Sequence, residues 1–117
     1  MKHDERRLQV ACVRWFSLEY PEYAIYLHHS PNGGSRNKIE AANFKAMGVR
    51  AGFPDLILLL PRGGHPFLAV EMKAQGGRLS DNQRTYLTAL EAVGARCEVV
   101  KSFAQFMDII KSYLHGE

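Results

Sequence analysis

The chain has few cysteines and no long apolar run. Its 117 residues include only Cys12 and Cys97, which lie far apart and lack the spacing of a metal site. This argues against a disulfide framework, so we expect both thiols to be reduced and buried among apolar neighbours. No apolar run approaches the roughly 20 residues that cross a bilayer, and residues 1–7 lack the apolar core of a signal peptide. We therefore expect no membrane association and a cytoplasmic location.

The charge is modest but uneven along the chain. The formal net charge is +3, and residues 1–84 hold 12 Lys and Arg against 8 Asp and Glu. Residues 85–117 hold 3 basic and 4 acidic residues. A divalent cation on some of the first eight acids would make that part more positive still. This distribution favours a polyanion as partner, although a merely basic surface would look the same.

Charged residues interrupt the two most apolar runs of the chain. Asp55 opens the run 55–60, and Glu71 and Lys73 close the run 67–73. Buried charges cost several kcal/mol each unless they are paired or bind a metal. The residues between the runs, 61–65, have the composition of a hairpin loop. If the two strands pair, Asp55 meets the Glu71 end at one edge of a sheet.

Hydrophobic periodicity predicts a single domain, 1–117, of the α/β class. The central runs are apolar on both faces, so helices should cover both sides of the sheet. We expect a mixed sheet of about four strands in the order α-β-α-β-β-α-β-α. The helices are predicted over about 3–19, 37–47, 80–93 and 102–114, and the strands over 24–28, 55–60, 67–73 and 96–100.

The charged strand ends have the composition of a site for metal-assisted phosphodiester hydrolysis. Side chains two apart on a strand share a face, so Glu71 and Lys73 point the same way. Magnesium prefers carboxylates, backbone carbonyls and water, which Asp55, Glu71 and the Met72 carbonyl can supply. Lys73 could position water or neutralise the phosphate. The alternative is an ordinary salt bridge at a strand end.

The motifs in order resemble a known nuclease family. Gly52-Phe53-Pro54-Asp55, then Glu71-x-Lys73, then Leu79-Ser80-x-x-Gln83 resemble the PD-(D/E)XK superfamily, and more narrowly its VRR-NUC branch. The loop 31–34 and the segment 48–52 fit the same pattern. The resemblance covers about residues 4–114 and implies a restriction-endonuclease-like core.

The resemblance also implies roles for individual residues. Asp55 and Glu71 match the metal ligands, and Lys73 matches the catalytic lysine. Glu5 matches an acid on the first helix that approaches Mg²⁺, or Mn²⁺ in its place, directly or through water; Glu19 shares the apolar face and competes with it. Gln83 matches a glutamine at the site, but with Ser80 it also fits a helix capping box. The candidate catalytic residues are therefore Asp55, Glu71, Lys73, Gln83 and Glu5, and the candidate metal ligands are Asp55, Glu71, the Met72 carbonyl and Glu5.

A set of basic and loop residues is a candidate DNA-binding surface. Each of them alone is an ordinary solvated residue or turn former, and together they could contact phosphates. The set is Asn32, Gly33, Arg36, Lys38, Lys45, Arg50 and Arg78.

These expectations combine into a Mg²⁺-dependent or Mn²⁺-dependent endodeoxyribonuclease. A lone small domain suits a symmetric dimer with two sites, and stand-alone members of the family imply cleavage of Holliday-junction-type DNA. The compact form resembles phage or bacterial members, which implies work near the nucleoid or in a phage-infected host. Two alternatives stay open: a flap-directed or end-directed nuclease, and a catalytically silent nucleic-acid-binding module with the same fold.

Overall fold

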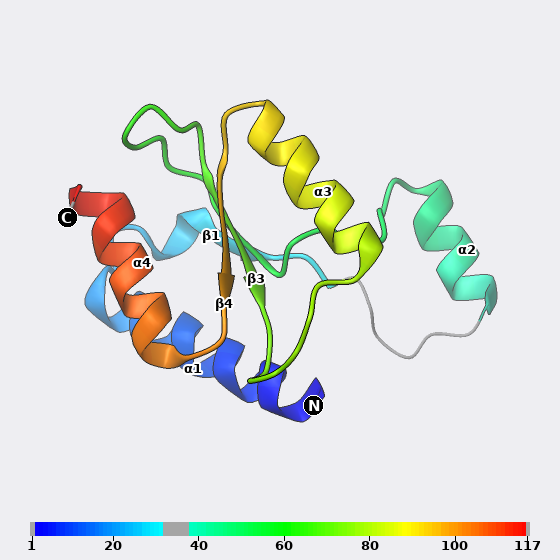
Figure 1. Cartoon of the computed structure of the whole chain (residues 1–117), viewed down its shortest axis with the longest axis horizontal. Coiled ribbons are helices and arrows are strands. Elements are labelled where there is room, and N and C mark those ends of the chain that lie inside the picture. The colour runs from blue at the N-terminus through cyan, green and yellow to red at the C-terminus, as the bar shows by residue number, and fades with distance from the viewer. Residues whose placement is uncertain (1, 32–37, 117) are drawn as a thin grey trace.

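The computed structural model describes residues 2–31 and 38–116, without the side chains of residues 2 and 3. Its elements follow the predicted order of helices and strands (Figure 1). No helix in the described ranges is long and apolar enough to cross a membrane. The helices are α1 (Lys2–Glu19), α2 (Lys38–Ala46), α3 (Asp81–Ala92) and α4 (Phe103–His115), with a 3-10 helix η1 (Ala24–Tyr26), and the strands are β1 (Leu27–His29), β2 (Leu56–Leu58), β3 (Leu68–Met72) and β4 (Arg96–Val100).

The four strands form one mixed sheet in the order β1-β2-β3-β4. β1 and β2 are antiparallel, β2 and β3 are antiparallel, and β3 and β4 are parallel. The predicted α/β class with a mixed sheet is therefore confirmed. The hairpin is also present, and its loop is closed by a pair of hydrogen bonds between the backbones of Arg62 and His65, 3.0 and 2.8 Å long.

The strand predicted over 24–28 is wrong in its first half. Residues 24–26 form a 3-10 turn because the Tyr26 amide donates to the Tyr23 carbonyl, at 2.9 Å, and not to another strand. Sheet pairing begins only at Leu27, opposite Leu58. β2 and β3 are likewise shorter than the apolar runs that predicted them, because the ladder between them covers three pairs. Hydrophobicity marks the buried length, whereas pairing defines the strand.

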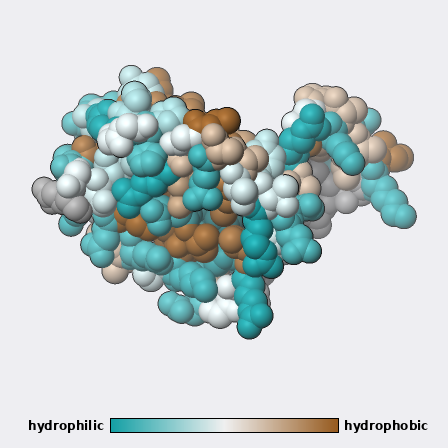
Figure 2. All heavy atoms as spheres, turned by 45° about the horizontal axis from the view of Figure 1, so that its top comes forward, coloured by the Kyte–Doolittle hydropathy of each residue, from teal (hydrophilic) through white to brown (hydrophobic). Residues whose placement is uncertain are grey.

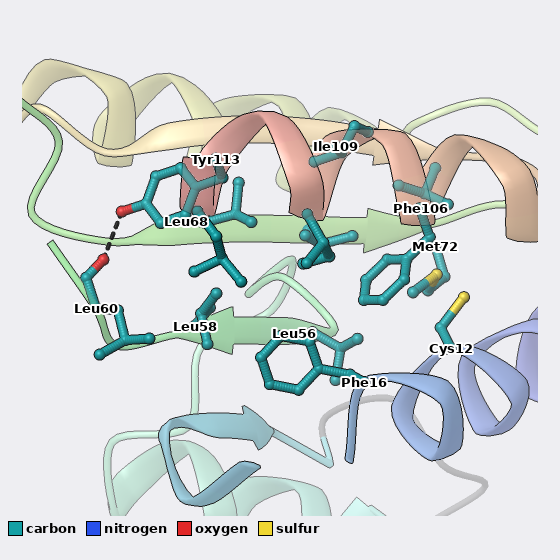
Figure 3. Packing of buried hydrophobic residues seen from close by; sticks show 14 residues of the cluster. Cys12, Phe16, Leu56, Leu58, Leu60, Leu68, Met72, Phe106, Ile109 and Tyr113 are labelled. Atoms are coloured by element: carbon teal, nitrogen blue, oxygen red, sulfur yellow. Dashed lines mark hydrogen bonds between the residues drawn. The ribbon is translucent and has the colours of Figure 1, made fainter. Parts of the chain in front are cut away.

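Helices cover both faces of the sheet, as predicted. The main core lies on the face covered by α1 and α4 (Figure 3), where Phe16 and Phe106 are fully buried against the alternating residues of β2 and β3. The Tyr113 hydroxyl donates to the Leu60 carbonyl at 2.6 Å, so the one polar atom of this ring is satisfied. On the opposite face, α3 contributes the buried Leu87. The backbone carbonyl of Leu87 accepts a hydrogen bond from the Cys97 thiol at 3.6 Å. Both cysteines are free; Cys12 is buried as predicted, and Cys97 is only half-buried.

α2 stands apart from this two-sided core. None of its described residues is buried, and Ile39 is 75% exposed. Figure 1 places α2 beyond the N-terminal end of α3, and Figure 2 shows it as a separate lobe. The Val49 amide donates to the Phe44 carbonyl at 2.9 Å, which closes the C-terminal end of the helix before the chain returns to the sheet. α2 therefore adds surface beside the sheet and little to the core.

Candidate active site

The β2–β3 register brings Asp55 to Glu71. Leu56 pairs with Val70, so Asp55, the residue before β2, lies opposite Glu71, the residue after Val70. Asp55 is half-buried, and its Oδ2 accepts a hydrogen bond from the Met72 amide at 2.8 Å. The two carboxyl groups lie close enough to repel each other electrostatically. The predicted convergence of these acids at one edge of the sheet is confirmed.

Pro54 explains why a backbone carbonyl is available beside these acids. Continued by one more pair, the register sets Pro54 opposite Met72. Proline has no N–H, so β2 offers no ladder donor to the Met72 carbonyl. The Met72 amide, which would bond to β2 in a longer ladder, donates to the Asp55 side chain instead. The Pro-Asp pair thus ends the ladder and leaves a carbonyl oxygen next to two carboxylates.

Gln83 performs both of the roles between which its sequence could not decide. Its backbone amide donates to Ser80 Oγ at 3.2 Å, and its side-chain Oε1 accepts from the Ser80 backbone amide at 2.8 Å. These two bonds form the predicted capping box. Its Nε2 also donates to Glu71 Oε2 at 2.9 Å. Gln83 therefore caps the first turn of α3 and also holds one oxygen of Glu71.

Glu71 is the one buried charged residue in the described part of the chain, at 2% exposure. Its Oε1 is buried and has no hydrogen-bond partner. The pKa of Glu71 is raised to about 9, mainly by burial and then by the neighbouring Asp55 carboxyl; the charge of Glu5 adds to the rise, and the charge of Lys73 opposes it. Without a cation, the unpartnered oxygen is satisfied only by a proton. A divalent cation between the two carboxyls would satisfy it with both groups ionised.

The residues present fit such a cation as a two-carboxylate site. Among residues 2–31 and 38–116, no group of three or more His, Cys, Asp or Glu side chains is placed to hold a metal. Asp55, Glu71 and the Met72 carbonyl are three oxygen donors, and magnesium commonly completes its shell with water. In the part of the chain that the structure describes, the donors that would hold such a cation are therefore two carboxylates and one backbone carbonyl.

The two candidate acids of α1 are separated by their place on the helix. Glu5 is half-buried, and its charge acts on Glu71. Glu19 is exposed at the other end of α1, about 20 Å along the helix axis. Of the two acids, Glu5 is therefore the one near Glu71. Lys73 is half-buried, forms no ion pair with the described residues, and acts on Glu71 through its charge.

Gly52 allows α3 to reach Glu71. Its φ is +85°, and a Cβ there would lie 2.5 Å from the Asn82 carbonyl and 2.8 Å from the Gln83 amide nitrogen. The loop before Asp55 is thus pressed against the first turn of α3. A side chain at this position would push away the helix turn that carries Gln83.

Comparison with known proteins supports the same description. The family model of the VRR-NUC domain matches residues 3–104. This chain belongs to the VRR-NUC family. A solved structure named a VRR_NUC domain protein is similar, with 29% sequence identity and a TM-score of 0.81, and the match covers 94% of this chain and 87% of the other. No curated protein matches the chain. The fold is of the nuclease type, and it implies a nucleic-acid substrate.

The described basic residues that were predicted to bind DNA lie on α2 and in two loops of this VRR-NUC domain. Lys38 and Lys45 are exposed on α2, whereas Arg50 lies in the following loop and Arg78 in the loop before α3. Asn32, Gly33 and Arg36 lie outside the described residues. A DNA-contacting role for any of them stays a prediction.

Sequence reasoning missed a basic surface and a structural histidine of the VRR-NUC domain. Arg6, Arg7 and Arg14 are exposed on α1 and line one shallow hollow of about 410 Å³. Their helical spacing, away from the apolar face, was the available signal. His29 Nδ1 donates to the Asp55 carbonyl at 2.7 Å, which ties the edge strand β1 to the start of β2. No local sequence pattern signals this bond, because it joins residues 26 positions apart.

Proposed function

We propose that this chain is a divalent-metal-dependent endodeoxyribonuclease that uses Mg²⁺, with Mn²⁺ as a substitute. The observation that carries the proposal is the buried Oε1 of Glu71, which has no partner and lies beside the Asp55 carboxyl at the edge of the sheet. Burial, with the Asp55 charge beside it, raises the pKa of Glu71, and such a perturbed pair is typical of a functional site. A structural salt bridge would have a partner for each oxygen.

The residues divide the work of phosphodiester hydrolysis. The cation would be held by Asp55, Glu71 and the Met72 carbonyl, and it would act as a Lewis acid on the phosphate. Gln83 fixes the Glu71 carboxylate by its Nε2 hydrogen bond. Lys73 would orient the attacking water or offset charge on the scissile phosphate as water attacks phosphorus and one P–O bond breaks. Glu5 would reach the cation through water.

The finer substrate proposal is branched DNA cut by a homodimer. A single small domain offers little surface for selecting a sequence, and none of its described helices shows a groove-reading arrangement of side chains. Two copies about a two-fold axis would present two sites, which suits symmetric cuts in a four-way junction. We place this activity in the cytoplasm, near the nucleoid or in a phage-infected host.

The test is cleavage of labelled four-way junction, flap and duplex DNA with Mg²⁺, Mn²⁺ or EDTA. We expect metal-dependent cuts placed symmetrically in the junction, and no cuts by Lys73→Ala. Binding without metal-dependent cutting, equal in the wild type and Lys73→Ala, would establish the silent module instead. Cuts confined to flaps or ends would replace the junction proposal, and light scattering on the same sample measures the mass of the oligomer.

A further inference from the structure

A second concave site lies between α2 and α3. It is a hollow of about 360 Å³, and the residues that define its character are Phe44, Met47, Val49, Arg50, Phe53 and Tyr86. It has no part in holding the two carboxylates. Its size falls at the lower end of the range for small-ligand sites, about 300–1,000 Å³.

The hollow is joined to the carboxylate site by two short connections. Phe53 is two residues before Asp55 in the same segment, and Tyr86 follows Gln83 by about one turn of α3. Between them, Gly52 is pressed against the backbone of Asn82 and Gln83. The walls of the hollow are therefore set by the same contact that positions Gln83. A ligand in the hollow would lie beside a phosphate held at the carboxylates.

The side chains that line the hollow favour a planar ligand that is linked to an anionic group such as a phosphate. Phe44, Phe53 and Tyr86 line the hollow, and all three residues are half-buried. Phe53 and Tyr86 pack edge to face, with ring centroids 5.1 Å apart, which holds both rings in fixed orientations. Arg50 is exposed and also lines the hollow, and a guanidinium suits both stacking and phosphate contact.

We propose that this hollow binds an unpaired nucleobase next to the scissile phosphate. The inference rests on the proposed nuclease function and specifies its substrate as DNA with a single-stranded or unstacked nucleotide at the cut. Aromatic surfaces bind bases of any sequence by stacking, and a base at a branch or flap is less costly to expose than one inside a duplex. The domain thereby selects branched DNA without reading base edges.

The test measures whether the base and the hollow contribute jointly to binding. Branched DNA is prepared intact or with an abasic residue on either side of the cut that the cleavage assay maps, and binding is measured in EDTA. We expect one abasic position to weaken wild-type binding about ten-fold. Tyr86→Ala should bind intact DNA about ten-fold more weakly and lose most of the abasic penalty. Tyr86→Phe keeps the ring and should behave as the wild type.

Two further variants make the result independent of folding defects. Phe44→Ala changes the wall of the hollow that α2 provides, and it should also reduce the abasic penalty. It replaces Tyr86→Ala in the test if circular dichroism shows that Tyr86→Ala is not folded. Val93→Ala is the control, since Val93 is exposed at the C-terminal end of α3 and does not line the hollow. It should leave both affinities unchanged.

The outcomes separate this inference from the proposed function. Metal-dependent cutting with no abasic penalty, or with the same penalty in Tyr86→Ala and Phe44→Ala, overturns the base site and leaves the nuclease intact. If the protein neither cuts nor binds any of the DNA substrates, both the base site and the proposed nuclease function are overturned. If a second copy of the chain fills the hollow instead, Tyr86→Ala changes the oligomer mass and not the abasic penalty, and the base site is also wrong.

Discussion

The two faces of β3 are equally buried but have opposite effects on stability. Leu68, Val70 and Met72 face α1 and α4 and are at most 1% exposed. Glu71 lies between them on the other face, toward α3, and is 2% exposed. Burying the apolar side chains stabilises the fold, whereas burying the carboxyl destabilises its charged form. The same strand thus supports the core with one face and a strained acid with the other.

Met72 connects the two faces. Its side chain is fully buried in the core, while its backbone amide donates to the Asp55 carboxylate at 2.8 Å. The acids are therefore positioned by backbone groups that the core keeps in place. The position of the two acids therefore depends on the core, although Glu71 itself weakens the fold.

Glu71→Gln should separate activity from stability most sharply. Removing a carboxylate that is proposed to bind the cation should lower metal-dependent cleavage by about 10²–10³-fold, the range found for loss of a single group that stabilises the transition state. The same change should raise the melting temperature in EDTA, because a neutral amide replaces the buried acid. Cleavage assays and thermal melts measure both effects. A variant that loses both activity and stability would contradict the division between the two faces.

Leu68→Ala should have the opposite pattern. Truncating this fully buried leucine leaves a cavity and should lower the free energy of unfolding by about 2–5 kcal/mol. Cleavage by the remaining folded protein at low temperature should be close to that of the wild type, because Leu68 does not contact the acids. Denaturant titration and single-turnover cleavage at matched folded concentration make the comparison. Exposed Leu59→Ala is the control and should change neither quantity.

Gln83→Ala should weaken cation binding by about 10–100-fold, the usual effect of losing a group that orients a metal ligand. It removes the hydrogen bond to Glu71 Oε2 together with half of the capping box. Ser80→Ala is the matched control, since it removes the cap, at a cost of about 1 kcal/mol, and leaves the Glu71 bond in place. Mn²⁺ titration calorimetry and thermal melts distinguish them. Equal losses of Mn²⁺ affinity in the two variants would show that Gln83 acts only as a cap.

The local parts of this site could be predicted from sequence, and the long-range contacts could not. Short continuous apolar runs predicted the two central strands, and the hairpin between them predicted that Asp55 meets Glu71. The capping box was predicted because Ser80 and Gln83 are three residues apart. The bond from Gln83 to Glu71 depends on how closely α3 approaches the sheet, which Gly52 permits. No local pattern encodes that distance.

The same reason explains the errors and the gaps. The first strand was predicted too early because residues 24–26 are apolar, and apolar composition does not distinguish a 3-10 turn from a strand. Glu5 and Glu19 share one helix face, so periodicity could not choose between them, and only the approach of α1 to β3 does so. The bond from His29 to the Asp55 carbonyl follows from the β1–β2 register, which composition does not set.

A pH dependence of stability should arise from Glu71. Its folded-state pKa is about 9, above the ordinary value of 4.5, because the acid is buried and lies beside Asp55. The folded chain therefore binds more protons than the unfolded chain between these pH values, and the free energy of unfolding falls as pH rises through that interval. One group contributes at most about 1.4 kcal/mol per pH unit. Denaturant titrations in EDTA from pH 5 to 9 should show a steeper fall for the wild type than for Glu71→Gln, and saturating Mg²⁺ should reduce the difference. If the free energy of unfolding changes with pH equally in the wild type and Glu71→Gln in EDTA, the pKa of Glu71 is not raised in the folded chain.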